Sequence, residues 1–204
     1  MNGIKNIIFD LGGVLLDINY QKSITTFEKL GIENFEEMFS QLKADELFEK
    51  LETGKVNETD FYSAIKKRTK AAITDEEIEK AWNALILHFR TESLDFLEKL
   101  AHKYNLYLLS NTNSIHLKYF NRLFTVETGQ LLLDDYFNKV WYSHEIGLRK
   151  PGTAIFEFVL KDEKLTAAET LFIDDSVNNI EAAASVGIKA RLLKADERIE
   201  NVLY

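Results

Sequence analysis

The chain has 204 residues, of which 46% are hydrophobic and 28% are charged, and it carries a formal net charge of −8 with no cysteine. This length and composition indicate a globular chain with one sizeable core, or a core with a smaller insert. The acidic balance argues against nucleic acid or an anionic membrane surface as a partner, and the lack of cysteine excludes disulfides and thiol catalysis.

The N-terminal residues enter a strand directly, without the basic region and long apolar run of a signal peptide. No segment of the sequence approaches the length of a membrane span. We therefore expect a cytoplasmic protein that acts on a small molecule, and we expect it to be a monomer or a weak dimer.

The first predicted strand covers residues 4–9 and ends in Asp10, which is followed closely by Gly12 and Gly13. Its isoleucines and phenylalanine suit a buried strand. In a doubly wound sheet the carboxyl ends of the strands face the ligand crevice, so Asp10 would lie at its mouth. The two glycines would allow a tight turn and a close approach of the backbone to a ligand. Taken alone, the stretch is better explained by a strand with an ordinary glycine turn.

Residues 20–89 have the apolar spacing of helices and no convincing strand. Asn57 can cap one of these helices, and Thr74 with Glu77 forms a capping box ahead of another. We interpret the apolar stripes as core packing. The segment 18–89 is then predicted to form a small all-helical cap domain, inserted after the first strand.

From Thr91 onward, helical segments alternate with strands predicted at 106–109, 140–142, 171–173 and 188–193. This alternation is typical of a parallel, doubly wound sheet. We therefore predict an α/β chain with a Rossmann-like core, built from residues 1–17 and 90–204, beneath the helical cap.

Polar residues follow several of these strands, and the predicted topology brings them to one edge of the sheet: Asp10, Ser110 and Asn111, Lys150, and Asp174 with Asp175. Two carboxylates about 4 Å apart repel by roughly 4 kcal/mol at an effective dielectric constant of about 20, so the cluster needs cations. Mg²⁺ prefers such oxygen ligands, and Lys150 supplies a fixed positive charge. Ionised Asp10 would be a competent nucleophile toward phosphorus, giving an aspartyl-phosphate that water hydrolyses.

Four strings of residues, taken together, resemble the ordered motifs of the haloacid dehalogenase-like (HAD) hydrolase superfamily: FDLGGV at 9–14, LSNT at 109–112, RKP at 149–151 and FIDDS at 172–176. The likeness includes a helical cap after the first motif. The strings are similar to those of small bacterial sugar-phosphate phosphatases of the α-D-glucose-1-phosphate phosphatase type.

The resemblance implies a role for each matching residue. Asp10 would be the nucleophile and a Mg²⁺ ligand, together with the backbone carbonyl of Gly12 and the carboxylate of Asp175. Ser110 and Asn111 would bind phosphate, and Lys150 would pair with phosphate and nucleophile. Asp174 would hydrogen-bond the waters of the metal, supported by Asn179.

One position departs from the family. Most phosphatases of the superfamily have a second aspartate, which protonates the leaving group, where this chain has Gly12. General acid catalysis is typically worth about 10²–10⁴-fold. A sugar 1-phosphate needs this help less, and His144 or Glu145 could substitute, although an ordinary surface role explains His144 more simply. His88, His102 and His116 lack the spacing of metal ligands and are interpreted as structural.

Specificity is expected from the cap. The loop of Glu52, Thr53, Gly54 and Lys55 breaks two cap helices, and Gly54 would let its backbone approach a substrate. A plain turn between helices is the alternative interpretation.

These observations favour a Mg²⁺-dependent phosphatase for a small sugar phosphate, such as the hexose 1-phosphate glucose 1-phosphate. A phosphosugar mutase would use the same intermediate, and a HAD-fold binding or regulatory protein would explain Gly12 by a loss of catalysis. Dehalogenase chemistry is disfavoured because it does not need the Asp174–Asp175 pair.

Overall fold

The computed structural model describes residues 3–40 and 43–203. At its centre lies a five-stranded sheet with the order β7-β6-β1-β8-β9, and all its pairings are parallel. Its strands are β1 (Asn6–Phe9), β6 (Asn105–Ser110), β7 (Lys139–Tyr142), β8 (Thr170–Asp174) and β9 (Lys189–Leu192). The chain moves outward from β1 to one edge and then crosses to β8 on the other side. This confirms the predicted doubly wound parallel sheet.

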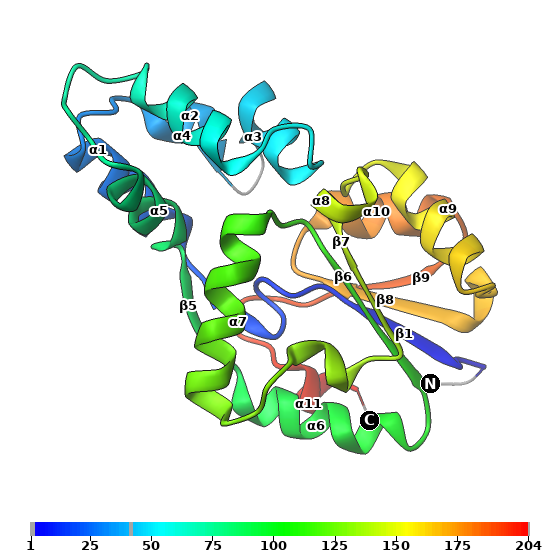
Figure 1. Cartoon of the computed structure of the whole chain (residues 1–204). Helices are drawn as coiled ribbons and strands as arrows, with labels where there is room; N and C mark the ends of the chain where they lie inside the picture. The colour runs from blue at the N-terminus through cyan, green and yellow to red at the C-terminus, as the bar shows by residue number, and fades with distance from the viewer. Residues whose placement is uncertain (1–2, 41–42, 204) are drawn as a thin grey trace.

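Helices cover both faces of the sheet (Figure 1). One face carries α8 (Ser143–Ile146), α9 (Thr153–Asp162) and α10 (Val177–Ser185), and the other carries α6 (Thr91–Ala101), α7 (Ser114–Thr128) and α11 (Ile199–Val202). The short 3-10 helices are η1 (Leu133–Tyr136) and η2 (Ala167–Glu169). Along β1, Ile8 packs into one apolar cluster while Ile7 and Phe9 pack into the other. Because side chains alternate along a strand, both faces of the sheet are buried.

Between β1 and α6 the chain leaves the sheet and forms an insert, coloured blue to cyan-green in Figure 1. Its helices are α1 (Tyr20–Lys29), α2 (Phe35–Met38), α3 (Glu46–Glu52), α4 (Glu58–Lys66) and α5 (Asp75–Asn83). Trp82 lies at the centre of their packing, with its ring against those of Phe27, Phe48 and Phe61. The predicted cap of α4 and the capping box of α5 are both present.

The insert also contains strands, so the prediction of helix throughout 20–89 is wrong in two places. β3 (Phe39–Ser40) pairs antiparallel with β4 (Lys43–Ala44). At the end of the segment, β5 (Ile86–Phe89) pairs antiparallel with β2 (Leu16–Ile18). A short apolar run such as residues 86–89 has no periodicity that separates strand from helix, and its partner lies far earlier in the sequence.

The β2–β5 ribbon carries the chain into the insert and back out. Arg90 ties the two crossings together: its backbone N–H donates to the Leu15 carbonyl at 2.9 Å, and its Nη1 donates to the Val14 carbonyl at 3.0 Å. Its Nε donates to Asp17 Oδ1 at 2.7 Å. The predicted boundaries at 17/18 and 89/90 fall in or beside this ribbon, and the division into two domains stays a prediction.

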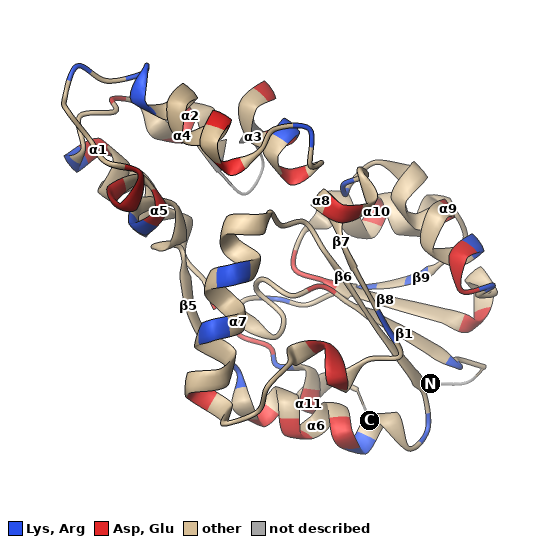
Figure 2. Cartoon of the chain, in the orientation of Figure 1, with Lys and Arg blue, Asp and Glu red and all other residues tan. Residues whose placement is uncertain are grey.

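Figure 2 shows basic and acidic residues interspersed along the helices of the insert and of the core. Within residues 3–40 and 43–203, no helix is both long enough and apolar enough to span a bilayer.

Candidate active site

The carboxylates predicted at the strand ends come together at one edge of the sheet. Asp10 directly follows β1, Asp174 ends β8, and the Asp10 N–H donates to the Ile173 carbonyl of the neighbouring strand at 2.9 Å. Each of Asp10, Asp174 and Asp175 offers a carboxylate oxygen within 4.8 Å of the others. Adjacent parallel strands that end together therefore build the acidic cluster without any contribution from the insert.

Lys150 provides the positive charge within this cluster. Its Nζ lies 2.7 Å from Asp10 Oδ1 and 2.7 Å from Asp174 Oδ2, and its side chain is only 1% exposed. Burial lowers the pKa of Lys150, but the two carboxylates outweigh it, so the net shift is upward. The ammonium group is thus a fixed cation shared by two strand ends.

Asp174 is held from several sides. Its Oδ1 accepts from the Ser176 N–H at 2.8 Å, and the side-chain amide of Asn179 reaches both of its oxygens, at 2.9 and 3.0 Å. With Lys150 on Oδ2 as well, both oxygens carry partners within the protein. This geometry suits the supporting role predicted for Asp174 and Asn179.

Asp175 owes its position to Gly13. Gly13 has a φ of +74°, and a Cβ atom built there would lie 2.3 Å from Asp175 Oδ2. Only glycine combines this backbone conformation with so close a carboxylate. Gly12 lies beside Gly13 and lines a cavity in front of the aspartate cluster. A Cβ atom built on Gly12 would lie 3.0 Å from Ile18 Cδ1.

Burial disfavours the ionised form of two carboxylates in the cluster. Burial raises the pKa of Asp10 to about 7, against the lowering effect of Lys150. Burial, followed by the charge of Asp174, raises the pKa of Asp175 to about 6. A divalent cation between Asp10 and Asp175 would lower both values, and the hard oxygen donors fit Mg²⁺. These two carboxylates, with the carbonyl of Gly12, are the groups that would hold the ion.

The predicted phosphate-binding residues lie on the other side of Asp10. Ser110 ends β6, is buried and lines the cavity. The side chain of Asn111 is engaged elsewhere: its Nδ2 donates to the Lys150 carbonyl at 2.9 Å, and its Oδ1 accepts from the Lys150 N–H at 2.9 Å. The side chain of Asn111 therefore holds the loop of Lys150, and the phosphate contact predicted for this residue would have to come from its backbone N–H.

A cavity of about 320 Å³ lies in front of these groups, a size suited to a small molecule. The core lines it with Asp10, Ser110, Lys150 and Asp175, among others. Glu52, from the loop in which the sequence placed specificity, lines the rest together with residues that the sequence did not single out as site residues, including Tyr20, Glu49, His116 and Arg149. Their types are common on ordinary helices, so only the folded arrangement identifies them.

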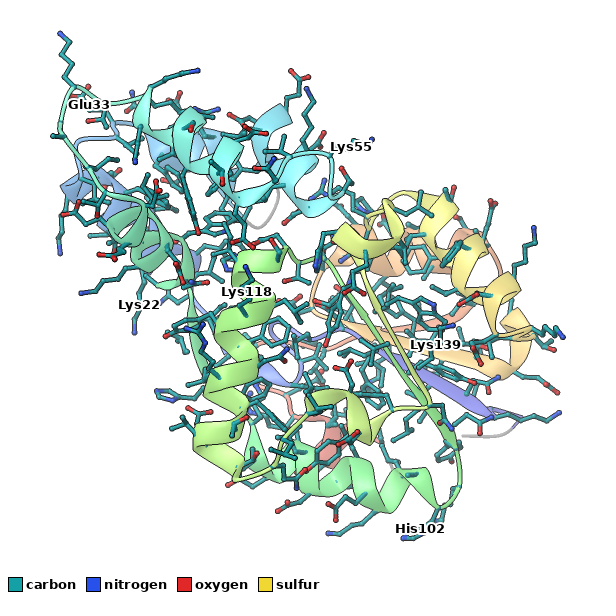
Figure 3. All side chains as sticks on the ribbon, viewed as in Figure 1. Lys22, Glu33, Lys55, His102, Lys118 and Lys139 are labelled. Carbon is teal, nitrogen blue, oxygen red and sulfur yellow. The ribbon has the colours of Figure 1, made fainter. Side chains whose placement is uncertain are left out.

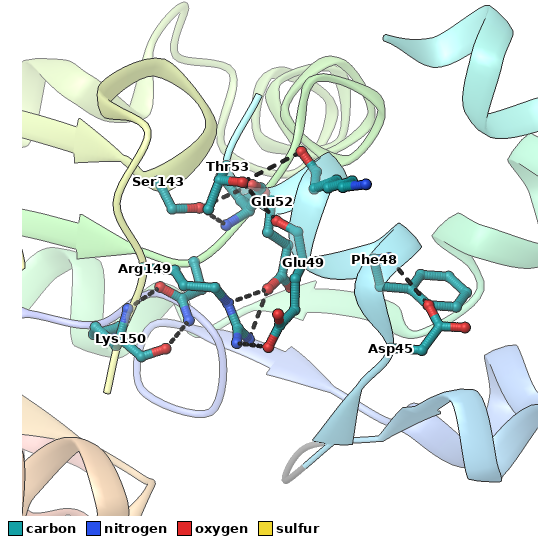
Figure 4. Close-up of polar contacts among 11 residues, drawn as sticks. Asp45, Phe48, Glu49, Glu52, Thr53, Ser143, Arg149 and Lys150 are labelled. Atoms are coloured by element: carbon teal, nitrogen blue, oxygen red, sulfur yellow. Dashed lines mark hydrogen bonds and ion pairs between the residues drawn. The ribbon is translucent and has the colours of Figure 1, made fainter. Parts of the chain in front are cut away.

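Glu52 and Arg149 join the insert to the core at the rim of the cavity (Figure 4). Glu52 Oε2 lies 2.9 Å from Arg149 Nε and 2.8 Å from its Nη2. Glu49, one turn earlier on α3, adds a contact of 3.3 Å to Nη1. Glu52 is 7% exposed, and its burial raises its pKa while Arg149 opposes the shift. The ion pair therefore anchors α3 beside the loop that carries Lys150.

Gly54 lies at the same junction but does not line the cavity. Its φ is +67°, and a Cβ atom there would lie 2.2 Å from the carbonyl oxygen of His144. The close backbone approach predicted for Gly54 is thus made to α8 rather than toward a substrate, and Glu49 and Glu52 supply the lining from this segment. Among the described residues, neither His144 nor Glu145 lines the cavity, so the geometry does not support either as a substitute acid.

Comparison with protein families identifies the chain. Residues 4–187 match the family of haloacid dehalogenase-like hydrolases. The chain belongs to this family, which confirms the resemblance carried by its four motifs.

Proteins similar to this chain include a phosphatase and several HAD family enzymes. The D-ribitol-5-phosphate phosphatase of Bacteroides thetaiotaomicron is 33% identical over 91% of this chain and 90% of its own length. An aspartate-to-alanine mutant of a HAD family enzyme from Bacteroides thetaiotaomicron, crystallised with magnesium and inorganic phosphate, is 36% identical. It has a TM-score of 0.92 and covers 98% of this chain and 99% of its own. A predicted HAD-like family hydrolase from Porphyromonas gingivalis is 31% identical, with a TM-score of 0.88 and coverage of 98% and 96%.

These relatives support a phosphoric monoester hydrolase. Magnesium is bound in the related crystal structures, and the present chain has the aspartate cluster that suits it. The predictions of the family, the fold and the metal agree with these findings.

Proposed function

We propose that the chain is a Mg²⁺-dependent phosphatase that hydrolyses phosphate monoesters of small sugars or sugar alcohols through an aspartyl-phosphate on Asp10. The observation that carries the proposal is the buried contact of Lys150 with Asp10 and Asp174, beside Asp175, at the floor of the cavity. The relative that acts on D-ribitol 5-phosphate favours a sugar-alcohol phosphate. A hexose 1-phosphate such as glucose 1-phosphate stays the prediction from the sequence.

In this mechanism Lys150 holds Asp10 through Oδ1 and orients the carboxylate for attack through its other oxygen. An Asp10 oxygen bonds to phosphorus as the ester O–P bond breaks, and the leaving alkoxide takes a proton from solvent water. Water then attacks phosphorus, the aspartyl O–P bond breaks, and phosphate and free Asp10 are released. The backbone N–H of Asn111 and the hydroxyl of Ser110 would hold phosphate oxygens, and Mg²⁺ would neutralise charge on the transferring group.

The identity of the leaving group decides how much Gly12 matters. The leaving oxygen of a sugar 1-phosphate departs easily, whereas that of a sugar-alcohol phosphate is an ordinary alkoxide that needs a proton. The ranking of these two substrate types therefore reports on protonation at the site. Cap closure by the insert, a cytoplasmic location, a monomeric or weakly dimeric state and the lack of nucleic-acid or membrane partners stay predictions from the sequence.

The test is phosphate release from a panel of sugar phosphates and sugar-alcohol phosphates, with Mg²⁺ and with a chelator. Asp10→Asn should lower the rate by about 10³-fold or more, because the amide cannot form the intermediate. Asp196→Asn, at an exposed position, is the matched control. Phosphate release that persists in Asp10→Asn, or that is equally fast with Mg²⁺ and with the chelator, would contradict the proposal.

The same assay separates the alternatives. A phosphosugar mutase would convert one sugar phosphate into its isomer while releasing little phosphate. A binding or regulatory protein would do neither across the whole panel.

A further inference from the structure

His116 lies where α7 of the core meets α5 of the insert. It sits in the first turn of α7, is 8% exposed, and lines the cavity. Its ring stacks on Trp82, with centroids 4.6 Å apart and planes 19° apart. Its Nδ1 is 2.9 Å from Asn83 Oδ1. Two neighbouring residues of the insert therefore fix both the plane and the rotation of the ring.

The contact of Nδ1 with Asn83 determines whether the other ring nitrogen, Nε2, donates or accepts a hydrogen bond. The carbonyl oxygen of an asparagine side chain accepts hydrogen bonds, so Nδ1 carries the ring proton and Nε2 is left as an acceptor. Burial lowers the pKa of His116 to about 3, so the ring is neutral at physiological pH. Within the described part of the chain, Nε2 is buried and has no hydrogen-bond partner. An unpaired buried acceptor typically costs about 1–3 kcal/mol, so the site calls for a donor.

The rest of the cavity indicates what kind of donor fits. Arg149 is already paired with Glu52 and Glu49, so its charge is compensated within the protein. Burial, followed by the charge of Glu52, raises the pKa of Tyr20 well above its usual value and keeps its hydroxyl neutral. A second anionic group on the ligand would therefore meet the carboxylate of Glu52 and the lone pair of His116. A neutral hydroxyl group on the ligand could instead donate a hydrogen bond to Glu52 or to His116.

We propose that His116 is a specificity-determining residue, whose Nε2 accepts a hydrogen bond from a hydroxyl group on the carbon chain of the substrate. The site then selects phosphate monoesters of polyhydroxylated molecules over alkyl phosphates and over phosphorylated acids. This inference rests on the proposed phosphatase function for the phosphate end of the cavity. A site built to hydrogen-bond a hydroxyl discriminates strongly against an analogue that lacks it.

The first experiment compares two substrates in His116→Phe, which keeps a ring against Trp82 but removes both nitrogens. One substrate is a five-carbon polyol phosphate, and the other is n-pentyl phosphate, which has the same chain length without the hydroxyls. We expect the ratio of their kcat/KM values to fall by about 10-fold or more in the variant. His102→Gln is the control, because His102 is exposed at the opposite end of the core from the insert (Figure 3). Equal losses for both substrates would overturn the inference.

A second measurement does not depend on turnover. Calorimetric binding of both phosphates to Asp10→Asn protein with Mg²⁺ should favour the polyol phosphate, and adding His116→Phe should reduce that preference. In ¹⁵N spectra of the Asp10→Asn protein, the unprotonated ring nitrogen of His116 should shift with the polyol phosphate but not with pentyl phosphate. Equal affinities, or an unmoved resonance, would mean that Nε2 faces only a buried water.

The two proposals fail differently. If the wild-type protein hydrolyses neither substrate, the phosphatase proposal fails, while calorimetry and ¹⁵N shifts still decide the role of His116. If both substrates are hydrolysed equally well, the phosphatase proposal stands and the hydroxyl selection is wrong.

Discussion

The two sides of the cavity are built in different ways. On the sheet side, Asp10 and Asp174 stand at or just beyond strand ends, and Lys150 contacts both of them from the loop that follows α8. On the insert side, Glu52 pairs with Arg149 from a distant motif, and His116 is held by Trp82 and Asn83 of α5. In the proposed function the sheet side supplies the groups that react and the insert side supplies the groups that recognise the substrate, and the positions of Asp10 and Asp174 follow from topology.

The charges differ in the same way. On the sheet side, three carboxylates lie close together and Lys150 contacts two of them, and a bound metal ion would reduce the repulsion among the three. On the insert side the ion pair is complete and the histidine is neutral. Substitutions on the sheet side should therefore act mainly on catalysis and metal binding, and substitutions on the insert side mainly on selectivity and on the attachment of the insert.

The largest effect is expected from Lys150→Met, which removes the shared cation but keeps an apolar chain of similar length. At saturating Mg²⁺, kcat should fall by about 10²–10³-fold, the usual loss for a group that stabilises transition-state charge. Steady-state kinetics on the preferred substrate measure this effect. Lys139→Met is the control, because Lys139 makes only surface ion pairs with Asp162 and Glu163. If kcat of the Lys150→Met variant stays within tenfold of the wild type, the sheet side does not act mainly on catalysis.

A smaller effect is expected from Gly13→Ala, because the new methyl group would displace the carboxylate of Asp175. Mg²⁺ affinity should fall by about 10–100-fold, as when the support of a metal ligand is disturbed. Calorimetric titration with Mg²⁺ measures the change. Gly129→Ala is a matched control, since Gly129 has a φ of +71° but open space around its would-be Cβ. Equal Mg²⁺ affinities in the two variants would show that the contact between position 13 and Asp175 does not control metal binding.

The smallest effect is expected on the insert side, from Glu52→Gln. The amide keeps the shape of Glu52 but leaves Arg149 without its main countercharge, so the free energy of unfolding should fall by about 1–3 kcal/mol. Urea denaturation measures this loss. Glu49→Gln, whose side chain is 52% exposed, should change it by less than about 1 kcal/mol. If the two variants behave alike, the buried pair does not anchor the insert.

The sequence was sufficient to predict the sheet side. Buried strands are readable from their apolar runs, and parallel strands end at one edge, so Asp10, Ser110 and Asp174 could be placed together before any coordinates were known. Lys150 followed from its motif. The supporting contact of Asn111 with the Lys150 backbone was not predictable, because an asparagine after a strand has many possible partners.

The insert side could not be predicted to the same degree. Helical periodicity identifies which residues are buried, but not which distant segment they contact. His116 reads as an ordinary buried histidine until the folded structure shows an unpaired ring nitrogen beside the cavity. Gly54 was recognised as a point of close approach, but the sequence could not show that the approaching group is the carbonyl of His144.

The side chain of Asn111 has one further consequence. The last paired residues of β6 and β7 are Ser110 and Tyr142, and immediately beyond them the Asn111 amide donates to and accepts from the backbone of Lys150. The Asn111 carboxamide bonds the N–H and the carbonyl of Lys150 as a peptide group of a neighbouring strand would. The pairing of β6 is thus continued by one side chain. The loop of the lysine is therefore mechanically part of the sheet rather than of the insert. Any rocking of the insert would move Glu52, Trp82 and Asn83 relative to Arg149 and His116 of the core, and would leave the ammonium group in place beside Asp10.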